Sequence, residues 1–234
     1  MKQGQHGTLV VAGASSGIGG EVARALEPRC KRLLGVARRD ALAGESVRVD
    51  VTTREGIDQI VSALQGEALD ALLYMAGTWE TGAFTGDYAF EDCSDEDLVR
   101  VMAVNLIAPI RLTQALLPAL RRADNPKVIF MGALSGLDNF PAREVANSAS
   151  KFGLRGAVHA LREELRPDRI GVTVINPGYV GTPHVLEELR REGTSPDEAI
   201  PMEDLLLIID TVLAVSRRTC IKEIQLPAMA GRGA

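Results

Sequence analysis

Short apolar runs alternate along the chain with longer stretches in which apolar residues recur every three or four positions. The short runs predict buried strands, and the recurring pattern predicts helices that pack one face against them. Strands are expected within 8–14, 31–38, 46–52, 68–77, 126–133, 170–178 and 221–227. Helices are expected within 19–28, 53–66, 94–123, 143–167, 183–200 and 202–216, with Ser94 or Asp95 as the N-cap of the third.

This alternation of strands and helices predicts an α/β fold, a doubly wound Rossmann-type parallel sheet of about seven strands with helices on both faces. No repeat, low-complexity tract or flexible linker divides the sequence. A single domain over 1–234 is therefore expected, with a small substrate-lobe excursion near 183–200.

Composition narrows the class of protein. The net charge is −5, with acidic and basic residues mixed, so a nucleic-acid-binding face is not expected. The three histidines (His6, His159 and His184) are scattered and the three cysteines are widely spaced, so no metal site is predicted. The apolar runs are too short to span a bilayer and the N-terminus lacks an apolar leader, so we expect a cytoplasmic protein without a membrane partner.

A glycine-rich loop lies between the first predicted strand and the first predicted helix. In "VAGASSGIGGEVA", Gly13 would permit a tight turn, Gly17 would let the backbone approach a pyrophosphate, and Gly19 would let the helix pack closely on the sheet. The helix N-terminus would then face an anion. The alternative is a glycine-rich turn that binds nothing, but the strand–turn–helix context favours nucleotide binding.

The end of the second predicted strand bears on the choice of nucleotide. Arg38 and Arg39 stand where an acidic residue would favour a free ribose 2′-hydroxyl, and an arginine accommodates a 2′-phosphate instead. Ser15 could add a hydroxyl donor from the glycine loop. The pattern favours NADP over NAD, although Asp40 follows directly and a solvated arginine remains the alternative.

Several segments resemble the short-chain dehydrogenase/reductase superfamily over nearly the whole length. They are "GASSGIG" at 13–19, "VDVT" at 49–52, "YMAG" at 74–77, "VMAVNLIAP" around Asn105 and "INPGYVGTP" at 175–183. The second half of "YMAG" matches the family's NNAG turn, whereas its two asparagines are absent. The resemblance implies a cofactor site formed by Gly13, Ser15, Ser16, Gly17, Ile18, Gly19, Arg38, Asp50, Val51, Ala76, Gly77, Lys151, Pro177, Gly178, Val180 and Thr182.

The same resemblance implies a catalytic set of Asn, Ser, Tyr and Lys, which this chain carries only in part. Asn105 and Lys151 match, but Asn147 stands at the tyrosine position and Ala133 at the serine position. In the family the phenol donates a proton to a carbonyl oxygen as hydride reaches the carbon, and the lysine lowers the phenol's pKa. An asparagine amide can hydrogen-bond that oxygen but cannot give up a proton at neutral pH.

Four other side chains could supply the missing acid. Ser135 lies two residues beyond the expected serine, Tyr179 lies beside the "INPG" turn, Tyr74 ends the fourth strand, and His184 begins the excursion. We take Asn105, Asn147, Lys151 and Tyr179 as the candidate catalytic positions.

The sequence thus leaves several functions open. The first is an atypical NADP(H)-dependent oxidoreductase acting on a small carbonyl or an activated alkene. The second is an inactive pseudoenzyme, a cofactor-binding or structural subunit, and the third is an NADPH sensor. The resemblance also implies that the two long predicted helices, 94–123 and 143–167, pair subunits in a homo-oligomer (dimer or tetramer), or in a hetero-oligomer with an active homologue; the alternative is that their apolar positions face only their own sheet. The substrate is not readable.

Overall fold

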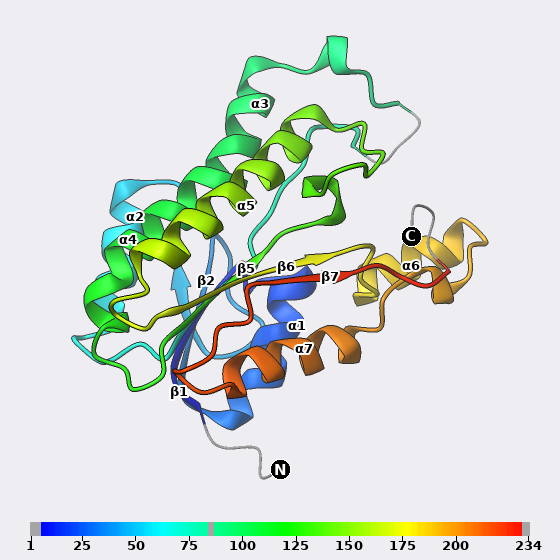
Figure 1. Ribbon diagram of the computed structural model, residues 1–234. Coiled ribbons are helices and arrows are strands. Elements are labelled where there is room, and N and C mark those ends of the chain that lie inside the picture. Colours follow the sequence, from blue (N-terminus) through cyan, green and yellow to red (C-terminus); the bar gives the residue numbers. More distant parts are fainter. Residues whose placement is uncertain (1–5, 84–86, 231–234) are drawn as a thin grey trace.

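The computed structural model describes residues 6–83 and 87–230 and contains one seven-stranded sheet (Figure 1). Its strand order is β3-β2-β1-β4-β5-β6-β7, and every neighbouring pair is parallel. The strands are β1 (His6–Ala12), β2 (Cys30–Ala37), β3 (Glu45–Arg48), β4 (Ala71–Tyr74), β5 (Lys127–Met131), β6 (Gly171–Pro177) and β7 (Glu223–Leu226). The predicted doubly wound α/β fold is confirmed.

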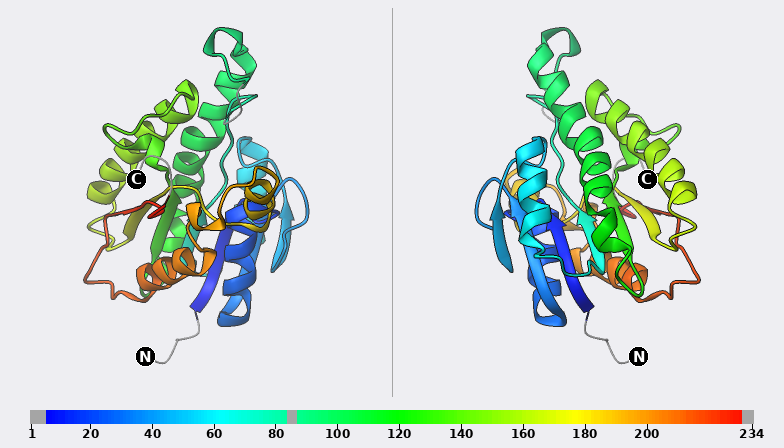
Figure 2. Two further views of the ribbon diagram at one scale, coloured as in Figure 1. Left: turned by 90° about the vertical axis from the view of Figure 1, so that its right-hand side faces the viewer. Right: turned by 90° about the vertical axis from the view of Figure 1, so that its left-hand side faces the viewer.

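Helices cover both faces of this sheet (Figure 2). They are α1 (Gly17–Leu26), α2 (Arg54–Ala63), α3 (Asp95–Met102), α4 (Ala108–Leu120), α5 (Val145–Glu164), α6 (Pro183–Arg191) and α7 (Met202–Ala214). Alternate residues of β1 show the division, because Leu9 and Val11 pack with α1 and α7, whereas Val10 and Ala12 pack with α2, α4 and α5. Two apolar layers therefore bury the sheet, as the period of two along a strand requires.

The predicted helix over 94–123 contains an irregularity. Ser94 caps it, since its side chain accepts a hydrogen bond from the Asp97 N–H at 3.1 Å. Between α3 and α4 the chain makes one π-helical segment, η3 (Ala103–Ile107), with Asn105 buried in it. Such a segment adds a residue to the turn and often accompanies functional sites.

This helical run, Asp95–Leu120, is long and apolar enough by composition to cross a membrane, and it is the one run of that kind within 6–83 and 87–230. Here it lies along the sheet, where Val101, Leu112 and Leu116 are fully buried. A helix in the core of a protein can have the same length and hydropathy as a membrane-spanning helix.

Two other boundaries differ from the sequence prediction. The third strand ends at Arg48 rather than Thr52, because Asp50 accepts hydrogen bonds from the N–H and the hydroxyl of Thr52 and bends the chain into a turn. The excursion at 183–200 consists of α6 and a short 3₁₀ turn, η5 (Pro196–Glu198), rather than one helix.

Candidate active site

All strands run in the same direction, so their carboxyl ends lie at one edge of the sheet, where open α/β folds bind ligands. The loops after β1, β4, β5 and β6 meet at this edge. They carry most of the residues that the sequence predicts for a cofactor and for chemistry.

The glycine loop after β1 has the conformation that its sequence predicts. Gly13 has φ +91°, and a Cβ there would lie 2.7 Å from the Ala76 nitrogen. A Cβ on Gly19 would lie 2.4 Å from the Gly13 oxygen, so α1 packs directly on the turn. Gly17, at φ +55°, begins α1 and has open space beside it. The loop therefore leaves room at a helix N-terminus, where backbone N–H groups favour an anion.

The residues expected to meet the adenosine half of a nucleotide lie at the ends of β2 and β3. Arg38 and Arg39 are exposed, and Asp40 pairs with Arg48 at 3.6 Å. Hydrogen bonds from Thr52 lower the pKa of Asp50, with Arg38 contributing by its charge. Ser16 is exposed and Ser15, Ile18 and Val51 are half-buried. This surface is compatible with a nucleotide and does not by itself distinguish NADP from NAD.

Lys151 is the buried cation of the site. Its Nζ donates to the Met131 carbonyl oxygen at 3.0 Å, and burial lowers its pKa to about 8. A Cβ placed on Gly77 would lie 3.8 Å from both this Nζ and the Asn105 Oδ1. The structure thus brings together the loop after β4, the π segment η3, the end of β5 and α5.

Asn105 joins two of these elements. Its Oδ1 accepts from the Thr78 N–H at 2.9 Å, while its Nδ2 donates to the Thr78 carbonyl at 2.9 Å and to the Ser150 hydroxyl at 3.1 Å. Ser150 in turn donates to the Asn147 carbonyl at 2.7 Å. Asn105 therefore fastens the loop after β4 to α5, whatever further role it has.

Asn147 faces this network from the first turn of α5. It is 1% exposed, its Oδ1 accepts from the Ser135 hydroxyl at 3.0 Å, and its Nδ2 makes a long contact of 3.4 Å with the Thr78 carbonyl. Ser135 therefore lies beside Asn147. Ala133, at the position expected for serine, ends the extended chain just after β5.

The other candidate acids are less well placed. Tyr74 is 1% exposed, donates to the Val104 carbonyl at 2.7 Å, and has a pKa raised far above its usual value by burial. It faces the core beneath α4 rather than the cleft, so the suggestion that it supplies the acid is wrong. Tyr179 donates to Glu188 at 2.9 Å, and burial followed by this bond raises its pKa to about 12. His184 is exposed at the start of α6.

The segment after β6 borders the site on the side where β7 lies. The Gly178 N–H donates to the Leu226 carbonyl at 2.9 Å, and Val180 makes a parallel bridge with Ile200. Thr182 is buried and precedes α6, with Pro183 as its first residue. Pro177 is the last residue of β6. The four predicted positions Pro177, Gly178, Val180 and Thr182 therefore lie at or just beyond the carboxyl end of that strand.

A residue that sequence reasoning missed lies next to Asn147. Glu80 is 3% exposed, and its Oε1 accepts from the backbone N–H of Ala146 at 2.6 Å and of Asn147 at 3.2 Å. The Tyr88 hydroxyl accepts from the N–H of Val145, which precedes them, at 3.2 Å. Glu80 is the one charged residue between Asp70 and Asp87, and this isolated charge was the signal available in the sequence.

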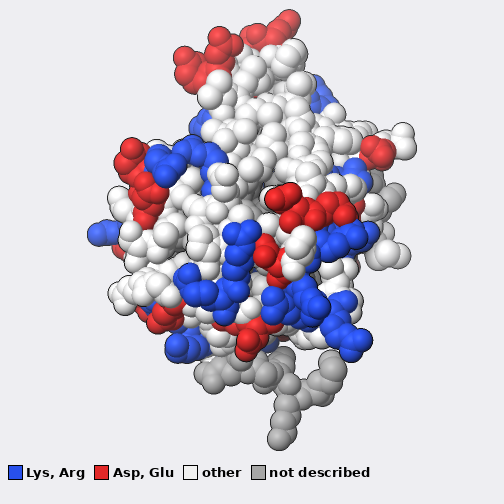
Figure 3. All heavy atoms as spheres, turned by 60° about the vertical axis from the view of Figure 1, so that its left-hand side comes forward, with Lys and Arg blue, Asp and Glu red and all other residues white. Residues whose placement is uncertain are grey.

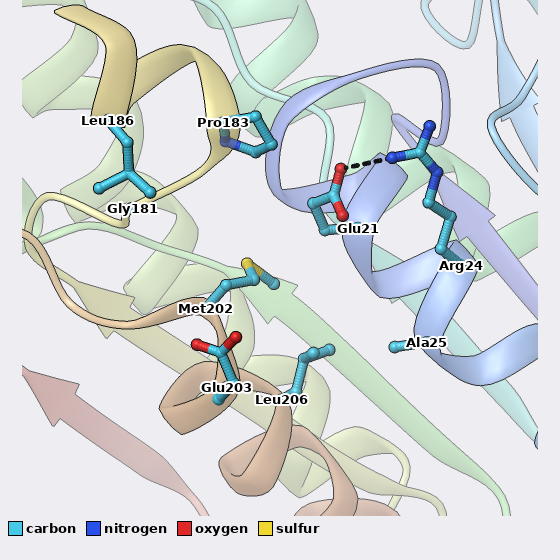
Figure 4. Close-up of a pocket in the computed structure, with 9 residues that line it drawn as sticks. All are labelled: Glu21, Arg24, Ala25, Gly181, Pro183, Leu186, Met202, Glu203 and Leu206. Atoms are coloured by element: carbon cyan, nitrogen blue, oxygen red, sulfur yellow. Dashed lines mark hydrogen bonds and ion pairs between the residues drawn. The ribbon is translucent and has the colours of Figure 1, made fainter.

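An open hollow of about 430 Å³ lies beside the site rather than in it (Figure 4). Glu21 and Arg24 of α1 face it as an ion pair, and Pro183, Leu186, Met202 and Leu206 line it from α6 and α7. None of the four candidate catalytic positions lines this hollow. It is separated from Asn147 and Lys151, which lie on the opposite face of the sheet.

Comparison with known families identifies this arrangement, since residues 7–193 match the model of the short-chain dehydrogenases. The chain belongs to the short-chain dehydrogenase family. Among its relatives is a 3-ketodihydrosphingosine reductase of Bacteroides thetaiotaomicron, 31% identical over 181 residues, which cover 74% of this chain and 64% of that protein. The chain spans about two thirds of the length of the curated short-chain dehydrogenases it matches.

Solved structures of other dehydrogenases and reductases share the fold. L-sorbose reductase from Gluconobacter frateurii, complexed with NADPH and L-sorbose, matches with a TM-score of 0.81 at 21% identity, over 97% of this chain and 98% of its own. A 4-hydroxyisoleucine dehydrogenase complexed with NADH and succinate matches with a TM-score of 0.77 at 20% identity, over 95% and 100%. Structural neighbours in this family thus bind both kinds of nicotinamide nucleotide.

Proposed function

We propose that this short-chain dehydrogenase is an NADP(H)-dependent oxidoreductase that acts on a small substrate with a polarised double bond, a carbonyl or an activated alkene, without the usual phenol. The observation that carries the proposal is the convergence at one sheet edge of an open glycine turn and a buried lysine. Gly17 has open space beside it, and Lys151 and Asn105 flank the position above Gly77.

The residues present fit a nicotinamide nucleotide. A Cβ on Gly13 or Gly19 would meet the protein's own backbone, as expected for the tight turn and the close helix packing of a dinucleotide-binding loop, while Gly17 keeps open space for a pyrophosphate. Lys151 would hold the ribose, and the segment from Pro177 to Thr182 would surround the nicotinamide. The nucleotide would supply the hydride chemistry, while the protein binds, orients and excludes water.

The preference for NADP rests on charge. Arg38 and Arg39 are exposed at the end of β2, and Asp40 is engaged with Arg48. An exposed arginine at this place offers a 2′-phosphate a planar fork of donors. The NADPH complex of the sorbose reductase neighbour is compatible with this proposal.

At the reacting carbon, Asn147 and Ser135 would take the places of the absent tyrosine and serine. The Ser135 hydroxyl is bonded to the Asn147 Oδ1, which leaves the amide Nδ2 with only its long contact to Thr78. That amide is a suitable donor for a substrate heteroatom. It cannot replace an acid, and loss of a general acid typically costs about 100- to 10,000-fold in rate.

A second function, binding of NADPH without turnover, is favoured by a separate observation. Tyr179 is bonded to Glu188 and Tyr74 is buried in the core, so neither phenol stands ready to donate a proton. In this alternative Lys151 serves ribose binding alone, and the protein acts as a sensor or as a subunit beside an active homologue.

The test is a fluorescence titration of the purified protein with NADPH and, in parallel, NADH, followed by a reduction assay with a panel of ketones, enones and imines. Binding of NADPH at micromolar concentration, tighter than NADH, with turnover of any of these substrates supports the oxidoreductase. NADPH binding without turnover of any substrate favours the second function, a sensor or a cofactor-binding subunit. No binding of either nucleotide overturns both.

We also propose that the protein forms a homo-oligomer through the helical run from α3 to α4 and through α5. The face shown in Figure 3 is largely uncharged over α3 and α5, below the acidic residues at its top. Val99 (68% exposed), Ile107 (46%) and Phe152 (40%) are exposed on α3, η3 and α5. Exposed apolar side chains on a largely uncharged face are typical of an interaction surface.

A further inference from the structure

Glu80 carries a buried oxygen that the fold does not satisfy. Oε1 receives two backbone hydrogen bonds from the first turn of α5, whereas Oε2 has no hydrogen-bond partner among the described residues. A buried carboxylate oxygen without a partner is costly and calls for a specific explanation. Capping of α5 explains the position of Oε1 only. It does not explain why the buried side chain is a carboxylate with a second, unpaired oxygen.

Among the residues that the structure describes, no cation forms an ion pair with Glu80. The titratable or charged residues around this end of α5 and the loop that carries Glu80 are Tyr88, Cys93, Asp97, Arg100, Arg143, Glu144 and Lys151. Arg100 pairs with Asp97 and donates to the Trp79 carbonyl at 2.8 Å. Arg143 donates to the Tyr88 carbonyl, and Lys151 donates to the Met131 carbonyl. Burial, then a hydrogen bond with Cys93, raise the pKa of Tyr88, and Glu80 contributes in the same direction.

This charge lies close to Asn147, the residue at the position of the absent phenol. The Asn147 N–H lies 3.2 Å from Oε1, and the two N–H donors at the positive end of a 20-residue helix are favourable partners for a carboxylate. The site therefore combines a missing acid with a carboxylate that adds a negative charge to the positive charge of Lys151. The absent proton donor and the carboxylate of Glu80 together influence which kind of double bond can accept hydride at this site.

A neutral carbonyl fits this combination poorly. As hydride adds to its carbon, the C=O electron pair moves to oxygen, and an alkoxide forms unless a proton arrives. Asn147 has no proton to give, and the Ser135 hydroxyl is a weak acid. A carboxylate nearby raises the energy of the developing oxyanion, since like charges repel strongly away from bulk water.

A protonated carbon–nitrogen double bond fits both features. Hydride from the reduced nicotinamide nucleotide forms the new C–H bond, the C=N π pair becomes the nitrogen lone pair, and the cation becomes a neutral amine. The nucleotide is oxidised, the substrate is reduced, and no proton is transferred in that step. A nearby negative charge stabilises the cationic electrophile, and so no general acid is required.

We propose that Glu80 is a positioning and specificity-determining residue, which fixes the first turn of α5 and sets a negative charge beside Asn147, and that the preferred substrate is an imine reduced as its iminium cation. The inference rests on the proposed function and narrows its substrate from polarised double bonds in general to this class.

The experiment compares two probes of similar size, 2-methyl-1-pyrroline and cyclopentanone, with NADPH and the full chain. We measure kcat/KM for both in the wild type, in Glu80→Gln and in Glu91→Gln, with NADPH binding followed by fluorescence in each. Glu91 is exposed in the same loop, so its variant removes an equal charge away from the site. Circular dichroism verifies that each variant is folded.

In the wild type we expect the imine to be preferred, with a rate that rises as the pH falls and the imine becomes protonated. Glu80→Gln is expected to lower the ratio of imine to ketone kcat/KM by about tenfold, with NADPH binding unchanged, while Glu91→Gln leaves the ratio as it was. A purely structural role of Glu80 would lower both rates together and keep the ratio.

Three results overturn the inference. The first is a wild type that reduces the ketone in preference, which leaves the proposed oxidoreductase standing and remains informative if Glu80→Gln does not fold. The second is an unchanged ratio in a folded Glu80→Gln. The third is NADPH binding without reduction of either probe or of the broader panel, which overturns the proposed oxidoreductase as well.

Discussion

At the scale of single residues, the proposed function depends most on Asn147. It occupies the place expected for a phenol, and its side chain is held by Ser135 rather than by a charged group. Replacing it therefore changes the chemistry without removing an ion pair.

Asn147→Tyr combined with Ala133→Ser is expected to raise ketone reduction by about 100-fold or more, because it restores a general acid one helical turn from Lys151. Steady-state rates with NADPH and cyclopentanone measure the effect. Ala133→Ser alone is the control and should change the rate less than about threefold, since a hydroxyl without an acid supplies no proton. An equal gain from the single variant would contradict this account.

Lys151 is a second residue with a predictable effect, because its charge is buried. Burial lowers its pKa from 10.5 to about 8, so the charged form destabilises the folded state. The unfolded chain holds that proton up to a higher pH. The free energy of unfolding therefore carries the full penalty below pH 8 and recovers as the pH rises towards 10.5.

Lys151→Met should remove this penalty. We expect the variant to be more stable than the wild type by about 1–3 kcal/mol at pH 7, with the difference shrinking between pH 8 and pH 10. Urea unfolding at several pH values checks the trend. The same variant should bind NADPH at least about tenfold more weakly. A stability difference that grows with pH would show that the lysine is not the buried cation described here.

At the scale of elements, the backbone conformation of the glycine turn between β1 and α1 is expected to determine how tightly NADPH binds. Gly17→Ala places a Cβ in open space, so its cost to stability should be limited to the left-handed backbone, about 1–2 kcal/mol. NADPH binding should nevertheless fall by at least about tenfold, because the Cβ occupies the approach to the pyrophosphate. Fluorescence titration and urea unfolding separate the two effects.

Gly66 provides the matched control. It has φ +78° and open space around it, like Gly17, but lies in the turn after α2. Gly66→Ala should lose similar stability and keep NADPH binding unchanged. Equal losses of binding in both variants would mean that strain, rather than access to the turn, governs affinity.

The elements also show how far the sequence could predict the structure. The central strands β1, β2, β4, β5 and β6 were predicted because parallel strands buried on both faces form short apolar runs in the sequence. The glycine turn and Lys151 were found because their spacing is local. The π segment was not, since one added residue within 94–123 leaves the apolar pattern almost unchanged.

Contacts between distant elements could not be predicted in this way. Glu80 meets the first turn of α5 from 66 and 67 positions away, and Tyr74 reaches Val104 across 30 positions. Only the fold decides that Tyr74 points to the core and that Ser135 approaches Asn147. The acid candidates could therefore be named from the sequence but not ranked.

At the scale of the whole molecule, the uncharged face over α3 and α5 predicts the assembly. Phe152→Glu places a charge in that face and should convert an oligomer into monomers, since a buried unpaired charge costs more than the contact it replaces. Light scattering after size-exclusion chromatography measures the mass. Leu207→Glu is the control, because Leu207 is 64% exposed on α7 and belongs to the other side of the sheet. A wild type that is already monomeric would refute the proposed assembly.

The cap that Glu80 and Tyr88 place on α5 also limits how this protein can be recombined. The backbone N–H groups in the first turn of that helix donate to side chains of a loop that is distant in sequence. Helix and loop therefore depend on each other and should be exchanged together. A chimera that takes residues 143–167 from a relative and keeps the resident 78–93 would mismatch donors and acceptors at the very turn that bears the reactive position. Engineers who wish to transplant a working active site into this scaffold should exchange both segments together.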